Sequence, residues 1–500
     1  MKKTVFITGA TGVMGMAALR ELARHPDRFN IRLLVRKSKR NERKLRDYLH
    51  KSGISVIWGD LLDAASVGVA MGQASVVLHI GGMVSPMADH YPQKTLDVNV
   101  GGTKNIVDAI KRRPDADDVR LVYIGSVAQT SARHEPYHWG RTGDPVVASV
   151  YDYYGISKIL AERLVAESGL KRWVSLRQSG ILHPGLFTRG SDPITFHVPL
   201  RGVLEWATVE DSGRLMAGVC GDDVPEEFWC NFYNIGSGPQ YRLTNYEFER
   251  LILGAIGSPR PEKIFETNWF ATRNFHGCWY VDSDRLESLV PFRENLDVEE
   301  YFKRMVRQAP LWARMAPLAP PFVVKGLMRR VAKTPGDGTL DWLRRDDCEE
   351  KVTAFFGSRE ERDRIPSWKD YDLTPPSQEP VLLDHGYDET KKMESLALKD
   401  MARAAAFRGG KVISDYMKPG DLSSPLEWQC GRGHCFEASP RLVLKGGHWC
   451  PYCLPSPWRY DEEARINPFL AQVWHASHSP DECMVYDKDS EVNIPLGHIQ

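Results

Sequence analysis

Thr8-Gly9-Ala10-Thr11-Gly12-Val13-Met14-Gly15 is the most informative stretch of this sequence. It follows the apolar run Val5-Phe6-Ile7 and precedes an apolar-periodic run over residues 16–23, which predicts a strand, a glycine turn and a helix. Glycines suit such a turn because they permit tight backbone geometry and close approach to a pyrophosphate, which the helix N-terminus attracts. The spacing is GxxGxxG and not GxGxxG, so the motif alone leaves a simple turn as open as dinucleotide binding. The candidate cofactor contacts in this turn are Gly9, Thr11, Gly12, Val13, Met14 and Gly15.

Strand and helix signals alternate after this turn as far as residue 177. Further apolar runs predict strands at residues 31–35, 55–58, 74–79, 119–124 and 173–176, and helical periodicity lies between them, notably at 103–111 and 154–167. This alternation predicts an α/β fold in which helices cover both faces of a parallel, doubly wound sheet. Ligands of such sheets bind beyond the carboxyl ends of the strands, so candidate site residues follow each strand.

Bulk composition places the chain among globular proteins. Its 500 residues are enough for two or three domains, with 42% hydrophobic and 26% charged residues and a formal net charge of zero. This charge balance gives no global sign of binding to nucleic acid or to an acidic membrane. The N-terminus has no room for a signal peptide before the first strand, and no apolar run is long enough to span a bilayer, so we expect a cytoplasmic protein without a membrane partner.

The turns after the second, third and fourth strands carry candidate cofactor contacts. The second strand is followed by Arg36-Lys37-Ser38-Lys39-Arg40, where an NAD-selective site would place an acidic residue. These cations favour NADP over NAD, although they could also be the solvated start of a helix over residues 42–51. Asp60-Leu61 could receive the adenine amino group or begin a helix. His79 precedes Ile80-Gly81-Gly82, where Gly81 would approach the cofactor; His79 alone favours a packing role.

Ser126 and the pair Tyr154 and Lys158 form the candidate catalytic group. Ser126 follows the fifth strand, and Tyr154 and Lys158 are spaced i, i+4 on the next helix, so they share one face. A lysine ammonium beside a phenol favours the phenolate and should lower the pKa of Tyr154 from about 10 towards neutrality. The tyrosine would then serve as an acid/base at cytoplasmic pH. The glycine turn, the serine and the YxxxK pair together are far more specific than any one of them.

These residues resemble the extended short-chain dehydrogenases/reductases, of the NAD-dependent epimerase/dehydratase and 3β-hydroxysteroid dehydrogenase type. The resemblance covers about the first three hundred residues and implies a Rossmann sheet over residues 1–310 with a substrate lobe mainly at 185–310. Its carriers are residues 8–15, Gly59-Asp60-Leu61, His79, residues 98–105, Ser126, residues 154–158, residues 176–181 and residues 233–238.

The resemblance also implies roles for individual residues. Ser126 would hold the substrate oxygen, Tyr154 would move its proton, and Lys158 would hold the nicotinamide ribose and tune Tyr154. Asn99 would steady the active-site helix and a relay water. The segment with Gln178, Gly180 and Ile181 would lie along the nicotinamide, although Gln178 stands where the family often has proline.

The implied reaction is reversible hydride transfer between a nicotinamide cofactor and a hydroxyl or keto carbon. Val127 and Ala128 stand where a sugar-nucleotide 4,6-dehydratase should carry an acidic pair, which argues against that chemistry. Substrate would meet residues 129–153 and the aromatic-rich lobe, with a mild preference for an apolar alcohol or ketone. A nucleotide-sugar epimerase and a dinucleotide-sensing regulator remain as alternatives. The resemblance further implies a homodimer through the helices that carry Asn105 and Tyr154.

The second half of the chain begins at a proline-rich break, residues 316–321. Residues 311–421 are predicted as a mostly helical linker or accessory region that a second proline-rich stretch, 373–380, divides, with one amphipathic helix over 389–407. Residues 422–456 are predicted as a zinc-binding module and residues 457–500 as a tail with one helix over 461–474.

Four of the nine cysteines cluster between residues 430 and 453. The Cys-Pro-x-Cys knuckle and the earlier pair match structural zinc spacing. The segment resembles a small bacterial zinc-ribbon or treble-clef repeat, and that pattern implies Cys430, His434, Cys450 and Cys453 as ligands, whereas spacing alone equally allows Cys435 in place of His434. Such modules often bind nucleic acid or protein, but Arg432, Arg441, Lys445 and His448 supply only a modest basic face here.

Overall fold

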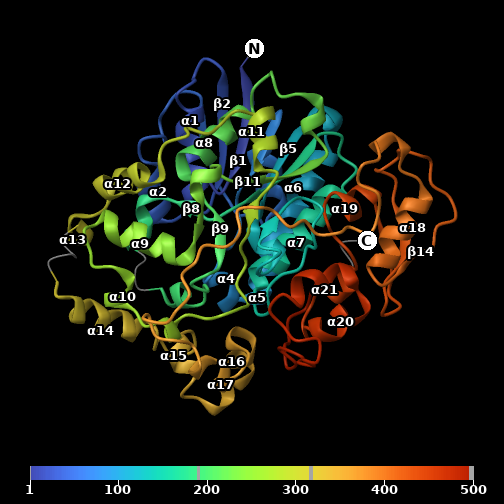
Figure 1. The fold of residues 1–500 in the computed structure, drawn as a ribbon. Helices are drawn as coiled ribbons and strands as arrows, with labels where there is room; N and C mark the ends of the chain where they lie inside the picture. The colour runs from blue at the N-terminus through green and yellow to red at the C-terminus, as the bar shows by residue number, and fades with distance from the viewer. Residues whose placement is uncertain (1, 189–191, 315–318, 495–500) are drawn as a thin grey trace.

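The computed structural model describes residues 2–188, 192–314 and 319–494, and its core is a parallel sheet of seven strands. The strand order is β11-β7-β5-β4-β1-β2-β3, and every neighbouring pair is parallel (Figure 1). The strands are β1 (Lys3–Thr8), β2 (Phe29–Val35), β3 (Ile54–Trp58), β4 (Val76–His79), β5 (Arg120–Ser126), β7 (Trp173–Gln178) and β11 (Asn231–Ile235). The six predicted strands and the Rossmann-type α/β fold are confirmed, and β11 adds a seventh strand beside β7.

Helices cover both faces of this sheet, which explains why its central strands are apolar almost throughout. Helices α1 and α8 pack together on one face, and α3, α6 and α7 lie on the other. The bounds are α1 (Val13–Leu22), α2 (Lys39–Leu45), α3 (Ala64–Met71), α4 (Met87–His90), α5 (Pro92–Leu96), α6 (Gly102–Lys111), α7 (Tyr153–Ala166), α8 (Val209–Gly218) and α11 (Ser283–Leu289). Among the described helices, none has the length and apolar content needed to cross a bilayer.

Helix α2 differs from the helix predicted over residues 42–51. It begins three residues earlier, because Ser38 is extended and its hydroxyl accepts a hydrogen bond from the Asn41 amide at 3.1 Å. It ends at Leu45, and turns follow. The basic residues after β2 therefore lie at the start of a helix, next to the carboxyl end of the sheet.

The predicted lobe lies against the carboxyl ends of the strands and has two small apolar cores. One core contains Leu182, Tyr241 and Tyr301, and the other contains Phe196, Phe265 and Trp269. The short strands β6 (Trp139–Gly140) and β13 (Trp279–Tyr280) pair with each other. The other elements of the lobe region are β8 (Ile181–Leu182), β9 (Val203–Glu205), β10 (Ala207–Thr208), β12 (Arg242–Thr244), α9 (Asn245–Ala255), α10 (Pro261–Ile264), α12 (Val298–Gln308), α13 (Leu311–Arg314) and α14 (Pro321–Val331).

The C-terminal region is less helical than predicted. Residues 364–392 form irregular structure, and the proline-rich stretch inside them runs across the Rossmann domain, where Ser377 O accepts hydrogen bonds from the His138 and Trp139 rings at 2.8 and 3.0 Å. The regular elements are α15 (Thr339–Trp342), α16 (Glu349–Phe356), α17 (Arg359–Asp363), α18 (Leu398–Phe407), β14 (Lys411–Val412), β15 (Leu426–Gln429), β16 (Cys435–Ala438), α19 (Pro440–Leu444), α20 (Tyr460–Ile466) and α21 (Pro468–Trp474).

Two predicted C-terminal helices are wrong in extent. The helix predicted over 389–407 covers only α18, because the Asp388 carboxylate binds the Thr390 amide and hydroxyl in a local turn and Ala397 is extended. The helix predicted over 461–474 is two helices. Pro468 has no amide hydrogen to continue α20, and Asn467 begins a new helix by accepting a hydrogen bond from the Leu470 amide at 3.2 Å.

The C-terminal region packs directly on the Rossmann domain. One continuous apolar cluster joins the α3, α6 and α7 face of the sheet to the core of residues 426–474, which includes Trp428, Leu442 and Trp458. Figure 1 shows α18 to α21 gathered beside α7. The segment predicted to bind zinc therefore shares this apolar cluster with the Rossmann domain.

Candidate functional site

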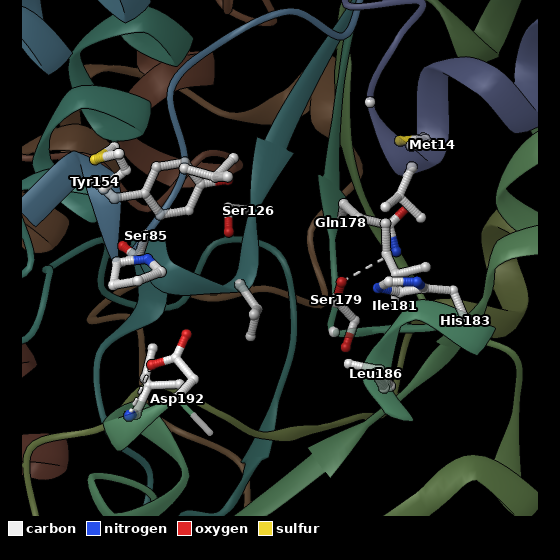
Figure 2. Close-up of a pocket in the computed structure, with 18 of the residues that line it drawn as sticks. Met14, Ser85, Ser126, Tyr154, Gln178, Ser179, Ile181, His183, Leu186 and Asp192 are labelled. Atoms are coloured by element: carbon white, nitrogen blue, oxygen red, sulfur yellow. Dashed lines mark hydrogen bonds between the residues drawn. The ribbon is translucent and has the colours of Figure 1, made fainter. Parts of the chain in front are cut away.

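A cavity of about 1420 Å³ lies at the carboxyl edge of the sheet, where the sequence predicts the cofactor. The residues predicted to contact the cofactor line it, with the exception of His79, and so do the candidate catalytic residues except Asn99. Figure 2 shows Ser126 and Tyr154 on one side and Gln178, Ser179 and Ile181 on the other. The predicted site residues that line the cavity are Gly9, Thr11, Gly12, Val13, Met14, Gly15, Arg36, Asp60, Leu61, Gly81, Ser126, Tyr154, Lys158, Gln178, Gly180 and Ile181.

The glycine turn is held by contacts that leave no space for side chains. Gly9 has φ +72°, and a Cβ there would lie 2.7 Å from Gly81 Cα. A Cβ on Gly15 would lie 2.2 Å from Gly9 O, so α1 starts directly against the turn. The backbone is thus the surface that faces the cavity, as binding of a pyrophosphate requires.

His79 supports the turn from behind. Its Nδ1 lies 2.8 Å from Thr8 Oγ1 and its Nε2 lies 2.9 Å from Thr103 Oγ1. Burial lowers the pKa of His79 to about 3, with a smaller contribution from the charge of Lys158, so the ring is neutral. Thr8 Oγ1 in turn accepts a hydrogen bond from the Gly81 amide at 2.9 Å. The packing role favoured for the isolated histidine agrees with this geometry.

Cations surround the end of the cavity beside β2. Arg36, Lys37, Arg40 and Lys44 all line it. The Lys44 ammonium donates to Thr11 O at 2.6 Å, and burial, followed by the charge of Arg40, lowers its pKa. Asp60 also lines this end, but its Oδ1 already accepts the Leu62 amide at 3.0 Å, and Asp63 is the residue that caps α3.

Ser126 and Tyr154 face one another, and Lys158 lies one turn along α7. Ser126 ends β5, and its hydroxyl accepts a hydrogen bond from the Ala128 amide at 3.2 Å. The Lys158 ammonium donates to Ile124 O at 2.7 Å and lies 6.0 Å from the Tyr154 ring centre. Strand β5 and helix α7 therefore bring the three predicted catalytic side chains to one wall of the cavity.

The pKa of Tyr154 moves opposite to the predicted direction. Burial, with smaller contributions from the charges of Asp152 and Asp89, raises it to about 12 against the opposing effect of a hydrogen bond with Ser126. Burial lowers the pKa of Lys158 to about 8, and this lysine points to a backbone carbonyl rather than to the phenol. The predicted lowering is therefore wrong for this structure. The phenol holds its proton at neutral pH, which is the state that a proton donor needs.

Asn99 is buried behind this wall. Its amide oxygen accepts the Met83 amide at 2.7 Å, and its Nδ2 donates to Met83 O at 3.0 Å and to Ser157 Oγ at 2.8 Å. Asn99 therefore ties α7 to the loop after β4, which is the positioning part of the role that the resemblance implies.

Gln178 occupies the place where the family often has proline. Its Oε1 accepts the Ser212 hydroxyl and its Nε2 donates to Ser179 O, both at 3.1 Å. The amide group is thus satisfied within the chain, and the main chain of residues 178–181 lines the cavity.

Three polar residues near Tyr154 were not among the predicted catalytic or cofactor-binding residues. His276 lines the cavity, and its Nδ1 lies 3.1 Å from Asp152 Oδ2, at the start of α7. Asp89 Oδ1 accepts a long hydrogen bond from the Tyr154 amide at 3.4 Å, and burial followed by the charge of Asp152 raises its pKa to about 7. Since Asp152 and His276 are 124 residues apart, no local motif could have paired them.

The end of the cavity formed by the lobe is mainly apolar. Trp206 and Phe248 stack with ring centres 4.5 Å apart, and Leu186, Phe187 and Ile252 lie with them on the lining. Glu249 is one of the polar residues at this end; it is buried there, and burial raises its pKa to about 7.

The predicted substrate segment, residues 129–153, meets the cavity only in part. Arg133 and His134 line it, whereas His138 and Trp139 bind Ser377 O and Arg141 binds Glu389. From the aromatic-rich lobe, Phe187, Trp206, Phe275 and His276 line the cavity, whereas the lobe aromatics Phe196, Trp269, Phe270 and Trp279 pack in cores.

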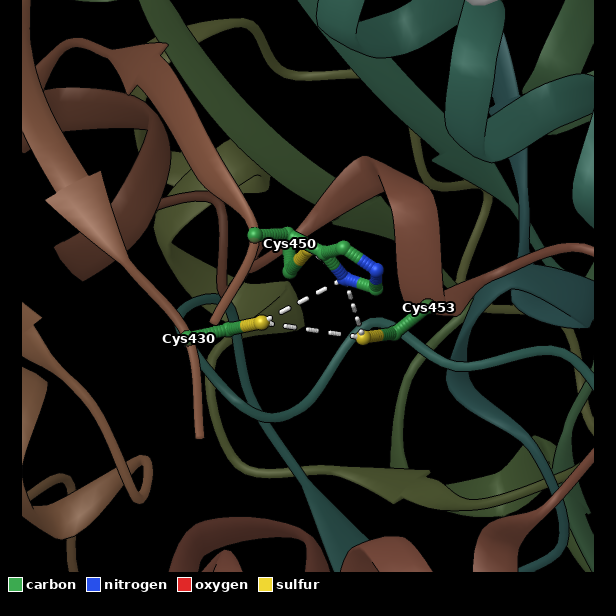
Figure 3. Close-up of side chains that lie close together, drawn as sticks. Cys430, Cys450 and Cys453 are labelled. Carbon is green, nitrogen blue, oxygen red and sulfur yellow. Dashed lines mark hydrogen bonds between the residues drawn. The ribbon is translucent and has the colours of Figure 1, made fainter. Parts of the chain in front are cut away.

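A second cluster lies in the C-terminal region (Figure 3). The Sγ atoms of Cys430, Cys450 and Cys453 lie 3.5, 3.6 and 3.5 Å from His434 Nδ1, and all four ligand atoms lie within 4.8 Å of one another. A tetrahedral zinc site with Zn–S of about 2.3 Å and Zn–N of about 2.0 Å has ligand separations of about 3.5 to 3.8 Å, so the donor set fits such a metal. Cys435 is exposed and outside the cluster, so the geometry selects His434 over Cys435.

The segment between the ligands docks on the helix that carries Tyr154. His448 Nε2 lies 2.8 Å from Glu162 Oε1, and the same oxygen lies 2.6 Å from Arg177 Nη2. Arg163 donates to Trp449 O at 3.2 Å and to Glu437 O at 2.5 Å. The outer side of α7 is therefore covered by the chain's own C-terminal region.

Comparisons with known proteins concern the N-terminal part of the chain. Residues 5–179 match the model of the NAD dependent epimerase/dehydratase family. Human 3 beta-hydroxysteroid dehydrogenase type 7 is 30% identical over 175 residues, which cover 33% of this chain and 45% of that protein. UDP-glucose 4-epimerase of Rickettsia rickettsii is 31% identical over 111 residues, 21% of this chain and 32% of that protein. The matches thus span less than half of the length of these relatives.

A solved structure extends the likeness in fold. The UDP-Glc/GlcNAc 4-epimerase from Campylobacter jejuni superposes with a TM-score of 0.50 at 14% sequence identity, over 63% of this chain and all of that chain. This similarity supports the Rossmann-like fold. The family match and the sequence relatives support an NAD-dependent enzyme of dehydrogenase or epimerase type.

Proposed function

We propose that this protein is an NAD(P)-dependent oxidoreductase that transfers hydride between the nicotinamide and a hydroxyl or keto carbon of an apolar small molecule. The observation that carries the proposal is the convergence of Ser126, Tyr154 and Lys158 on one wall of the cavity that the glycine turn also lines. Ser126 ends β5, Tyr154 and Lys158 lie one turn apart on α7, and all three lie at the carboxyl edge of the parallel sheet, where this fold binds ligands.

The residues present fit a nicotinamide dinucleotide, which supplies or accepts the hydride when bound. The backbone of residues 9–15 and the N-terminus of α1 would hold the pyrophosphate, and Lys158 would hold the nicotinamide ribose. Arg36, Lys37, Arg40 and Lys44 supply cations for a 2′-phosphate, which favours NADP over NAD.

Tyr154 is proposed as the acid/base and Ser126 as its partner at the substrate oxygen. With a pKa raised to about 12, Tyr154 is protonated at neutral pH and can donate to a ketone oxygen as the carbon is reduced. Ser126 faces the phenol and can donate a second hydrogen bond to the developing alkoxide. In the oxidation direction Tyr154 must first lose its proton, and its phenolate then accepts the proton of the substrate hydroxyl as hydride leaves the carbon. The largely apolar lining beyond these groups favours a hydrophobic alcohol or ketone.

A nucleotide-sugar epimerase is the second candidate, and the match to a 4-epimerase supports it. An epimerase returns the hydride to the same substrate, so the cofactor shows no net change. Following NADPH oxidation against a panel of ketones, steroids and nucleotide sugars separates the two reactions. Net oxidation supports the reductase, and product formation without it supports the epimerase.

The third candidate is a dinucleotide-sensing regulator that binds nucleic acid or protein through the C-terminal module. The basic residues that would serve it are engaged within the chain: Arg432 pairs with Glu462 and Glu463, Arg441 donates to Cys230 O, and His448 binds Glu162. These contacts favour a structural role for the module, with a zinc ion held by Cys430, His434, Cys450 and Cys453. A salt-dependent shift of nucleic acid would support the regulator instead.

The homodimer implied by the resemblance stays a proposal. Its predicted surface includes α7, whose outer side is covered by residues 437–449 of the same chain. A dimer through that side of α7 would have to displace this segment, and sedimentation of the purified protein measures whether a dimer forms.

A further inference from the structure

Helix α14 presents large apolar side chains to solvent at one edge of the molecule (Figure 1). Phe322 is 74% exposed, Leu327 is 55% exposed and Val323 is 40% exposed. Isolated exposed apolar residues are ordinary, but three on one face of an eleven-residue helix form a patch.

The same helix is cationic. Between Tyr301 and Gly336 the sequence contains eight lysines and arginines and no acidic residue, although the whole chain has a formal net charge of zero. On α14, Arg329 and Arg330 are exposed, one turn beyond the apolar patch. Lys325 is the exception, since it pairs with Glu266. The zero net charge of the whole chain therefore conceals a locally positive segment.

The inner side of α14 closes the apolar end of the cavity. Val324 and Met328 line the cavity, and Val331 packs with them against the lobe core. The helix packs on α10 and so belongs to the wall of the lobe. Helix α14 thus forms part of the wall at the lobe end of the cavity.

We propose that the outer face of α14 docks on the surface of an anionic lipid bilayer. Phe322, Val323 and Leu327 would enter the interface, and Arg329 and Arg330 would lie at the level of the lipid phosphates. A helix with an apolar patch beside Lys/Arg residues has the composition of an interfacial helix, and no membrane-spanning segment is needed for this mode of binding. The charge of the segment commits the proposal to anionic lipid, which attracts juxtamembrane cations within a Debye length.

Docking would place the apolar end of the cavity next to the bilayer, where a hydrophobic alcohol or ketone concentrates. This consequence rests on the proposed function, whereas the docking itself does not. A vesicle-binding measurement needs no substrate, so its failure is distinguishable from failure of the enzymatic proposal.

The test is co-sedimentation of the full-length protein with vesicles of phosphatidylcholine that contain phosphatidylserine, compared with phosphatidylcholine alone. We expect binding to the anionic vesicles that weakens as salt is added. Phe322→Ser/Leu327→Ser and Arg329→Gln/Arg330→Gln should each weaken binding by about tenfold or more, from lost apolar burial and lost charge respectively. Unchanged NADPH binding and an unchanged melting temperature would show that these exposed substitutions leave the fold intact.

Matched control substitutions are available at exposed positions that are distant in the sequence from α14. Val69 on α3 is 66% exposed, and Lys111 and Arg112 are exposed at the end of α6. Val69→Ser and Lys111→Gln/Arg112→Gln should bind the anionic vesicles as the wild type does. The proposal would be overturned if the wild type did not bind the anionic vesicles, or if both α14 variants bound them as strongly as the wild type does. If instead the wild type is a dimer that the α14 substitutions dissociate, without vesicle binding, the occupant of this face is a second copy of the chain and the proposal is wrong.

Discussion

Glu162 of helix α7 and His448 of the C-terminal region lie 2.8 Å apart, and both are buried. Arg177 of β7 completes the cluster, with its guanidinium 2.6 Å from the same Glu162 oxygen. Glu162 is one helical turn beyond Lys158, on the helix that also carries Tyr154. The C-terminal region is therefore linked through buried charges to the helix that carries Tyr154 and Lys158.

Glu162→Gln should destabilise the whole protein. The arginine and histidine beside Glu162 hold the pKa of its carboxyl far below its usual range, against the effect of burial. Removing this charge leaves Arg177 buried without its counter-ion, which costs about 3–5 kcal/mol. Chemical denaturation with fluorescence detection measures the free energy of unfolding.

The matched control for Glu162→Gln is Asp108→Asn, which breaks the partly exposed pair between Lys104 and Asp108 on α6. That change should cost about 0–1 kcal/mol. Equal effects of the two substitutions would contradict the importance given to the buried cluster.

The buried carboxyl of Glu249 should make the free energy of unfolding fall as pH rises. Burial raises its pKa to about 7, whereas in the unfolded chain it titrates near about 4.3, so the native state holds the proton more tightly across that window. The native state therefore loses roughly 3 kcal/mol of relative stability between about pH 4 and pH 7. Glu249→Gln should remove this dependence, and the exposed Glu379→Gln should keep it. Unfolding curves across this pH range measure the effect, and identical profiles for the wild type and Glu249→Gln would exclude it.

Arg36→Asp should shift cofactor preference from NADP towards NAD. Loss of one charge-assisted contact with a 2′-phosphate weakens NADP binding by about 10- to 100-fold, and the new carboxylate can receive ribose hydroxyls. Fluorescence titration with NADPH and NADH measures both affinities. Arg46→Asp is the control, because Arg46 is exposed close by and does not line the cavity. Unchanged selectivity in Arg36→Asp would show that Arg36 does not bind the 2′-phosphate of NADP.

The C-terminal cluster should hold about one zinc ion per chain. Elemental analysis of the purified protein measures this ratio. His434→Ala should lose the metal and lower the melting temperature, because structural zinc sites contribute folding energy. Cys435→Ser should retain both, since Cys435 lies outside the cluster. Zinc loss in Cys435→Ser with retention in His434→Ala would reverse the ligand assignment.

Local patterns predicted the parts of the site that lie within single segments. The turn at residues 8–15, Ser126 at the end of β5, and Tyr154 with Lys158 on α7 needed only strand order and helical spacing. The irregular structure of residues 364–392 could not be predicted in this way, because hydrogen bonds of this stretch go to residues far away in the chain, such as His138. The same holds for His276 beside Asp152 and for His448 beside Glu162.

Physical environment explains the error at Tyr154. The i, i+4 spacing correctly placed Lys158 one turn away, but spacing does not show burial or the direction of an ammonium group. Burial is the largest cause of the raised pKa, the charges of Asp152 and Asp89 add to it, and Lys158 donates to Ile124 O. The phenol of Tyr154 is therefore protonated at neutral pH, as the proposed donor role needs.

The most direct test of the central claim compares the wild type with Tyr154→Phe in NADPH oxidation against a panel of apolar ketones. The predicted result is net NADPH oxidation by the wild type with at least one ketone, reduced by about 10²- to 10⁴-fold in Tyr154→Phe, with NADPH affinity unchanged. Turnover by Tyr154→Phe at the wild-type rate would contradict the role of Tyr154 as the proton donor and, with it, the proposed reaction.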